Sequence, residues 1–278
     1  MNAQDRIGFM QGRLSPLVDG KIQAFPWNHW RSEFPAASEL GVRLMEWTLD
    51  HDRLYENPIM TEDGRREIAA LGERFHLTVP SLTGDLFMQA PFYKQTGAAR
   101  AELVADMRAV LEACARLGTR FVIMPLVDGG RIENDAQRDS LFDGLEQIRP
   151  FLLDKSMAVV FESDFEPARL ARFIEQLDRR AFGVNLDTGN SAALGWNHSE
   201  ELALYADRIL NVHIKDRLLG GTTVPLGEGA ADIAGTVAAL EKGGYRGNYI
   251  LQTARADDGD HAAAVARYRD MAASWIGA

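Results

Sequence analysis

The sequence contains one cysteine and no long hydrophobic run. Cys114 has no second thiol to pair with, and its helical pattern "AELVADMRAVLEACARLG" predicts a packed core thiol rather than a reactive one. No apolar stretch approaches the roughly 20 residues that a membrane span needs. The opening "MNAQDRIGFMQGR" also lacks the apolar core of a signal peptide. We therefore expect a cytoplasmic protein without a membrane partner.

Positive charge is also scarce, since 30 Lys and Arg residues face 40 Asp and Glu residues and give a net charge of −10. Such a field repels a phosphodiester backbone, so we expect no nucleic-acid partner. It leaves room for a small phosphorylated substrate held by a local basic pocket. No linker or charge block divides the 278 residues, which predicts one domain over residues 1–278.

Eight short apolar runs recur along the chain, and their composition suits strands buried on both faces of a parallel sheet. The runs cover residues 6–10, 43–49, 77–84, 120–126, 158–164, 182–187, 209–216 and 249–254. Amphipathic helical patterns lie between them, as in the shared face of Ile68, Leu71 and Phe75. Eight strand–helix units predict an α/β fold, a single (β/α)₈ TIM barrel. The longest irregular segments, 11–29 and 84–97, follow the first and third runs, where they can cover a pocket.

Four polar residues stand late in four consecutive apolar runs: Glu162, Asp187, His213 and Gln252. In a barrel these strand ends meet at one pocket. Two carboxylates, one imidazole and one amide oxygen suit one divalent metal ion, with Mn²⁺ first, then Mg²⁺, and Co²⁺ or Zn²⁺ as alternatives. Each residue also has a structural interpretation, as an ion-paired carboxylate, a core imidazole or an amide that satisfies backbone groups. Their joint phase on four adjacent strands favours a site.

Further polar side chains stand at or near the predicted barrel mouth, and we expect them to contact the substrate. They are Glu46, Asn190, Lys215, Arg217, Arg13 and Arg255. The arginines are suited to bidentate contacts with phosphate or carboxylate, whereas the alternative for each is a salt bridge with an acid such as Asp216.

The pattern of Glu162, Asp187 and His213 with "HIKD", "PLGEG" and "GYRGNYI" resembles the xylose isomerase-like barrel superfamily. More narrowly, it resembles the sugar phosphate isomerase/epimerase group, from "GFMQGRLSP" to the last helix. The resemblance implies a small-molecule sugar or sugar phosphate as substrate, and a homo-oligomer. It also implies one divalent ion held by Glu, Asp, His and a second Glu. In that group the two glutamates move protons through an enediolate.

Carried over by position, Glu162 is a ligand and base, and Asp187 and His213 are ligands. Gln252 falls where the second glutamate belongs, among the catalytic and metal-binding positions, and Asn190 falls where many relatives have a substrate-contacting His. An amide cannot return a proton. It also leaves the site with one negative charge fewer, which predicts weaker metal binding and a site more tolerant of an anionic ligand.

Three functions remain open at this point. The first is a metal-dependent isomerase or epimerase with Glu162 as main base and Glu46 or a water as second proton donor. The second is a dehydratase of a keto-sugar or keto-inositol, which needs one base only. The third is a sugar-binding protein without catalysis.

Overall fold

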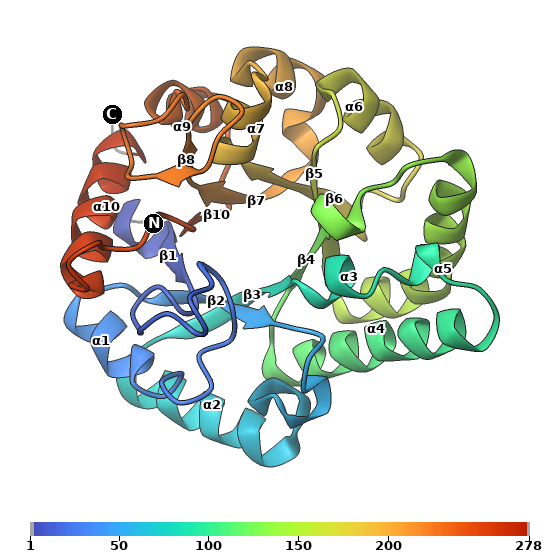
Figure 1. The fold of residues 1–278 in the computed structure, drawn as a ribbon, viewed down its shortest axis with the longest axis horizontal. Coiled ribbons are helices and arrows are strands. Elements are labelled where there is room, and N and C mark those ends of the chain that lie inside the picture. The colour runs from blue at the N-terminus through green and yellow to red at the C-terminus, as the bar shows by residue number, and fades with distance from the viewer. Residues whose placement is uncertain (1–2, 277–278) are drawn as a thin grey trace.

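The computed structural model describes residues 3–276, which form a closed barrel of eight parallel strands inside a ring of helices (Figure 1). Neighbouring strands follow the order β1-β10-β7-β6-β5-β4-β3-β2. The barrel strands are β1 Ile7–Met10, β2 Leu44–Leu49, β3 Thr78–Gly84, β4 Phe121–Leu126, β5 Ala158–Ser163, β6 Phe182–Asp187, β7 Ile209–Ile214 and β10 Asn248–Leu251. The predicted (β/α)₈ barrel is therefore confirmed. The first two and last two residues of the predicted 1–278 domain lie outside the described residues.

The seventh apolar run is shorter as a strand than the sequence indicates. It was expected to reach residue 216, but β7 ends at Ile214, and the backbone N–H of Lys215 donates to Thr188 Oγ1 instead of a neighbouring strand. The chain then turns into a small antiparallel pair, β8 Asp216–Arg217 and β9 Thr223–Val224.

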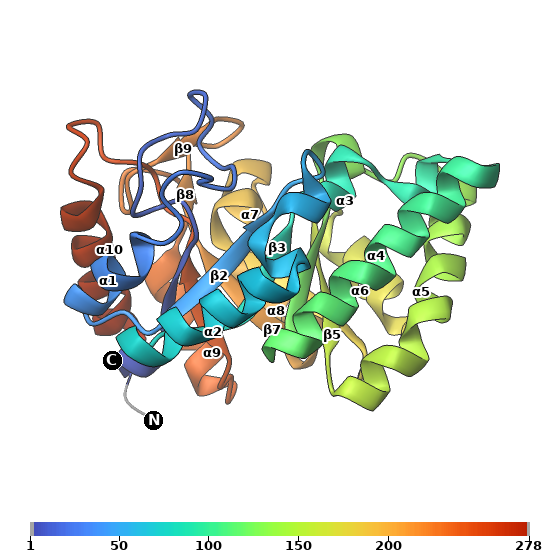
Figure 2. The ribbon, with the colours of Figure 1, turned by 90° about the horizontal axis from the view of Figure 1, so that it is seen from below.

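Helices surround the barrel (Figure 1) and pack apolar residues against it. They are α1 Glu33–Glu39, α2 Glu62–Phe75, α3 Leu86–Gln89, α4 Gly97–Leu117, α5 Asp135–Lys155, α6 Pro167–Glu175, α7 Thr188–Leu194, α8 His198–Tyr205, α9 Ile233–Lys242 and α10 His261–Ile276. Two of them, α3 and α7, lie at the carboxyl end of the strands (Figure 2). In α5, Leu141, Leu145, Ile148 and Leu152 recur at helical spacing and are all buried. Cys114 of α4 is a buried free thiol, as predicted, and burial raises its pKa to about 12. Within residues 3–276, no helix is both long and apolar enough to cross a membrane.

The segment 11–29 and the β8–β9 pair lie together at one end of the barrel, and β1 begins at the other (Figure 2). The Glu33 carboxylate fixes the start of this segment by accepting hydrogen bonds from the backbone N–H groups of Gly12 and Leu14 and from the Ser15 hydroxyl. The other long segment, 84–97, was expected to be irregular but contains α3, a helix of four residues that is too short to give a periodic signal. Both segments stand over the carboxyl ends of the strands, where barrels build their sites.

Candidate active site

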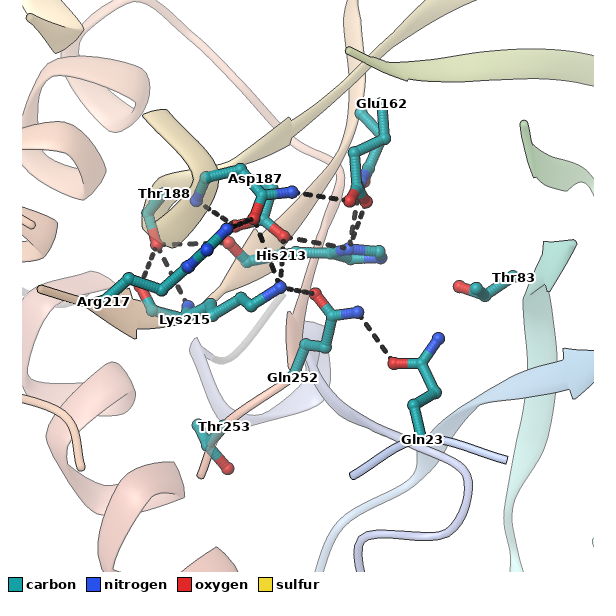
Figure 3. Close-up of polar contacts among 12 residues, drawn as sticks. Gln23, Thr83, Glu162, Asp187, Thr188, His213, Lys215, Arg217, Gln252 and Thr253 are labelled. Carbon is teal, nitrogen blue, oxygen red and sulfur yellow. Dashed lines mark hydrogen bonds and ion pairs between the residues drawn. The ribbon is translucent and has the colours of Figure 1, made fainter. Parts of the chain in front are cut away.

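The four strand-end residues of the predicted site converge at the carboxyl end of the barrel (Figure 3). Ligand atoms of Glu162, Asp187 and His213 lie within 4.8 Å of one another. His213 Nδ1 is 3.1 Å from Glu162 Oε2 and 3.9 Å from Asp187 Oδ2. Gln252 follows directly after β10 and turns its side chain toward the same group. The parallel register produces this cluster, because Asp187 of β6 pairs directly with His213 of β7.

Local structure fixes the direction of Asp187. This residue ends β6 and is the N-cap of α7, where its Oδ1 accepts the backbone N–H of Asn190 at 2.8 Å. Its Oδ2 remains free to face His213 and the Lys215 ammonium group. The Oδ1 atom of Asp187 therefore caps α7, and its Oδ2 atom faces the candidate site.

A second layer of polar side chains lies beneath His213. Glu46 Oε1 is 2.7 Å from His213 Nε2, and both side chains are completely buried. Thr83 donates to Glu46 Oε1, and Asn211 donates to Glu46 Oε2 at 3.0 Å. The predicted role of Glu46 was substrate contact, but its carboxylate faces the inside of the barrel and is bonded to these three partners.

Asn185 joins this second layer to Glu162. Its Nδ2 donates to Glu162 Oε2 at 3.0 Å and lies 3.0 Å from His213 Nδ1, while its Oδ1 accepts from Asn211. The predicted site did not include Asn185 and Asn211, although both interrupt otherwise apolar strands in "FGVNLD" and "ILNVHI". A buried amide inside a strand needs partners, which is the signal that could have revealed them.

Electrostatics in this cluster favour positive charge at His213. Burial alone would lower the His213 pKa, but the carboxylates of Glu46 and Glu162 outweigh burial and raise it to about 10. For Glu162, burial opposes ionisation, yet its hydrogen bond with His213 and the charges of His213 and Lys215 lower its pKa. Burial raises the pKa of Asp187, even though Lys215 works in the opposite direction.

A divalent cation fits this donor set. A neutral His213 that donates Nε2–H to Glu46 presents its Nδ1 lone pair to Glu162 and Asp187, the usual arrangement of a metal-binding histidine. Oxygens of Asp187, Asn190 and Gln252 already surround the Lys215 ammonium group, each at 3.3 Å from Nζ. These oxygens are thus oriented toward a positive charge. Glu162, Asp187 and His213 can hold a metal ion, with the Gln252 oxygen beside them.

A cavity of 480 Å³ opens above this cluster. Glu162, Asn190, Lys215, Arg217 and Gln252 line it, whereas Asp187 and His213 are buried and lie outside its lining. Asn190 connects the two sides of the cavity. Its Nδ2 donates to Glu162 Oε1 at 2.7 Å, and its Oδ1 accepts from Arg217 Nη1 at 2.8 Å. Five of the predicted residues therefore share one cavity with the candidate metal centre.

The other two predicted arginines are placed differently. Arg13 donates to the backbone oxygens of Thr253 and Ile22, and Arg255 donates to those of Ser15 and Ile22. Neither residue is in the cavity lining. Their guanidinium groups fasten the segment 11–29 to the strand end after β10, because its backbone carbonyls need donors.

Gln23 and Asp85 are among the cavity residues that the sequence prediction missed. Asp85 comes directly after β3, and its Oδ2 accepts from Gln23 Nε2 at 2.7 Å. Its place at a strand end is the signal that marks the other site residues. Gln23 lies in the segment 11–29, where no periodicity could reveal it.

Two proteins of known name are similar to this chain in sequence. The protein named "Putative L-ribulose-5-phosphate 3-epimerase SgbU" of Haemophilus influenzae is 24% identical over 246 residues, which cover 83% of this chain and 86% of that protein. The inosose dehydratase of Geobacillus thermodenitrificans is 25% identical over 152 residues, 46% of this chain and 51% of that protein.

A solved structure has the same fold over its whole length. It is a xylose isomerase-like TIM barrel protein from Mycobacterium smegmatis in complex with magnesium, with a TM-score of 0.69, 17% identity and coverage of 99% of both chains. The family described as xylose isomerase-like TIM barrel matches residues 34–273, most of the sequence. This chain therefore belongs to the xylose isomerase-like TIM barrel family.

Proposed function

We propose that this protein is a divalent-metal-dependent isomerase or epimerase of a sugar or sugar phosphate, with Glu162 as the base that removes a proton next to the carbonyl group. The observation that carries the proposal is the double position of Glu162. Its carboxylate lines the cavity and also faces the ligand atoms of Asp187 and His213. The name of the Haemophilus influenzae relative supports this class of reaction.

Glu162 is held as a ready base. Asn190 donates to its Oε1 and Asn185 donates to its Oε2, so both oxygens have fixed directions. Its lowered pKa keeps it ionised at neutral pH. When bound, a divalent ion would supply Lewis-acid polarisation of the substrate carbonyl. The Lys215 ammonium group at the cavity wall stabilises the negative charge that develops on substrate oxygens.

Mn²⁺ is the ion we propose first, because two carboxylates, an amide oxygen and one imidazole form an oxygen-rich set. Mg²⁺, Co²⁺ and Zn²⁺ are the alternatives. Removal of bound metal with a chelator, followed by calorimetric titration of each ion, tests this order. If none of the four ions binds, the metal-dependent mechanism fails.

The charges around the cavity favour an uncharged ketose over its phosphate. Three basic residues line the cavity, and each already has partners. Lys215 binds Asp187, Arg131 binds Asp164, and Arg217 binds Asn190 and the backbone oxygen of Gly221. A phosphate would have to take these donors from the protein.

The glycine-rich turn after β9 leads to the same conclusion. The backbone N–H groups of Gly227, Gly229 and Ala231 all donate to the carboxylate of Asp216. Convergent backbone N–H groups commonly bind phosphate, but here the chain supplies its own anion. We therefore place a neutral polyol ketone first among the substrates.

A dehydratase of a keto-sugar or keto-inositol is the second candidate. Gln252 favours it, because an amide cannot serve as the second proton-transferring carboxylate of an epimerase. The inosose dehydratase of Geobacillus thermodenitrificans supports it over part of the chain. A sugar-binding protein without catalysis is the third, and it predicts ketose binding without exchange of substrate hydrogen with solvent.

The deciding experiment follows hydrogen exchange in deuterium oxide with L-ribulose, D-fructose and scyllo-inosose. Wild-type protein loaded with Mn²⁺ is expected to exchange the hydrogen next to the carbonyl, and Glu162→Gln is expected to abolish exchange. The matched control is Glu112→Gln, at an exposed position of α4. Exchange that survives Glu162→Gln contradicts the role of Glu162. Mass loss of one water identifies dehydration, and unchanged mass with altered configuration identifies epimerisation.

A further inference from the structure

A chain of hydrogen bonds runs from the candidate metal centre to Asp85 (Figure 3 shows its first three members). Lys215 Nζ donates to Gln252 Oε1 at 3.3 Å, Gln252 Nε2 donates to Gln23 Oε1 at 2.9 Å, and Gln23 Nε2 donates to Asp85 Oδ2 at 2.7 Å. An ammonium group can only donate, so it fixes the orientation of the first amide. That amide fixes the second, whose NH₂ group must then face the carboxyl group of Asp85.

Asp85 is buried at the end of β3, with 3% of its surface exposed, and it lines the same cavity as Glu162. Among residues 3–276, Gln23 is the one group that donates a hydrogen bond to its carboxyl group. Burial and the negative charges of Asp50 and Glu162 outweigh the Gln23 hydrogen bond and the charge of Arg13, and they raise the Asp85 pKa to about 7.

Glu162 and Asp85 thus line the same cavity, but the surrounding hydrogen-bond donors differ between the two carboxyl groups. Both carboxylate oxygens of Glu162 accept hydrogen bonds, from Asn185 and Asn190, whereas the buried Asp85 carboxyl group has one neutral donor, Gln23. Two carboxyl groups in one site whose environments give them different pKa values commonly serve as the base and the acid of an enzyme.

We propose that Asp85 is the second proton-transferring residue of this site, acting from the β3 side of the cavity while Glu162 acts from β5, and that Gln23 and Gln252 position it. This inference rests on the proposed function. It supplies the proton transfer that Gln252 itself cannot perform.

In the proposed reaction Glu162 takes one proton from the substrate and Asp85 gives one proton back. In an epimerisation, the C–H bond next to the carbonyl breaks, its electron pair enters the enediolate and its proton goes to Glu162. The enediolate then takes the proton of Asp85 at the same carbon from the other side. A proton passes back from Glu162 to Asp85 through solvent. In a dehydration, the proton of Asp85 goes instead to the departing hydroxyl oxygen, the C–O bond breaks and water leaves.

The glutamine at position 252 is part of this arrangement. A glutamate there would be an acceptor and would turn the Gln23 NH₂ group toward itself, away from Asp85. The amide therefore does more than replace a lost carboxylate, because it orients Gln23 toward the carboxyl group that we assign to proton transfer.

The test uses the variant Asp85→Asn with the same three ketoses and Mn²⁺. It measures proton removal, seen as deuterium exchange, separately from product formation. Glu162 remains, so deuterium exchange next to the carbonyl is expected to persist. Product formation is expected to fall by about 100-fold or more. The matched control is Asp52→Asn, an exposed acid of the same barrel end outside this cavity, which should leave both rates unchanged. A second measurement on metal-free protein follows carbon-13 labelled carboxyl groups by NMR. One resonance that titrates near pH 7 is expected to be missing in Asp85→Asn.

The outcomes distinguish this inference from the function on which it rests. Wild-type product formation in Asp85→Asn overturns the inference, as does an Asp85 resonance that titrates near the ordinary aspartate value. Equal loss of exchange and product in this variant, with metal affinity retained, overturns it as well. No exchange by the wild-type protein, or exchange that survives Glu162→Gln, overturns the proposed function instead.

Discussion

His213 Nε2 and Glu46 Oε1 lie 2.7 Å apart in the closed centre of the barrel, where neither side chain is exposed. The carboxylate of β2 therefore fixes the imidazole of β7 so that Nδ1 faces Glu162 and Asp187. Glu46 touches no part of the cavity. Its geometry is that of a residue that positions His213, a candidate metal ligand, which differs from the substrate contact or proton donor that the sequence suggested.

Replacement of Glu46 by Gln tests this positioning role. Gln keeps the shape of the side chain but removes the charge that holds the Nε2 proton of His213. We expect Mn²⁺ affinity to fall by about 10- to 100-fold, as for other residues that orient metal-binding histidines. Isothermal titration calorimetry measures the change, and Glu112→Gln on exposed α4 is the control. If a folded Glu46→Gln variant bound Mn²⁺ with unchanged affinity, Glu46 would have no positioning role in the site.

The barrel and the cluster of Glu162, Asp187 and His213 could be predicted from the sequence for a common physical reason. Buried parallel strands form continuous apolar runs, and a charged residue such as Asp187 or Glu162 late in such a run is conspicuous because its burial needs compensation. Gln23 could not be found in this way. Its role depends on contacts with Gln252 and Asp85, 229 and 62 residues away in sequence. Arg13 was expected to contact the substrate, but it lies outside the cavity lining and donates to the backbone carbonyls of Thr253 and Ile22. Such partners carry no sequence signal.

Substitution of Gln252 by Glu tests how the charge of the candidate metal centre affects cation binding. A carboxylate beside Asp187 and Glu162 adds one negative charge and a stronger oxygen ligand. We expect Mn²⁺ to bind about tenfold more tightly or better, because a gain of 1.4 kcal/mol in cation binding suffices for this factor. The variant should also turn Gln23 away from Asp85. Calorimetry of Gln252→Glu and Gln252→Ala gives the comparison, and equal affinities in both variants and the wild type would show that residue 252 is no ligand.

The raised pKa of Glu33 is expected to make the free energy of unfolding depend on pH. Burial outweighs its hydrogen bonds with Gly12, Leu14 and Ser15 and raises its pKa from 4.5 to about 7. Between these values the folded protein retains a proton that the unfolded chain has lost. Stability from this group is therefore fully present below pH 4.5, falls as the pH rises, and is constant above about 7. The total is roughly 3 kcal/mol, from 1.36 kcal/mol for each pKa unit.

The variant Glu33→Gln should remove this slope. We expect the difference in unfolding free energy between wild type and variant to change with pH over that window, whatever the constant cost of the substitution. Urea unfolding at closely spaced pH values measures it. Parallel curves for the two proteins would place the Glu33 pKa near its ordinary value.

The closed turn around Asp216 predicts weak phosphate recognition. Three backbone N–H groups already bind this carboxylate, and a Cβ atom at Gly229 would lie 2.1 Å from Asp216 Oδ1, so the turn tightly encloses its own anion. We expect L-ribulose 5-phosphate to bind the Mn²⁺-loaded protein no more tightly than L-ribulose, and inorganic phosphate alone to give no measurable heat in calorimetry. Asp216→Asn serves as the comparison, because it removes the internal negative charge and should raise the affinity for phosphate if these N–H groups are the relevant donors. A wild-type preference of tenfold or more for the phosphorylated ketose, about 1.4 kcal/mol, would contradict the assignment of a neutral substrate.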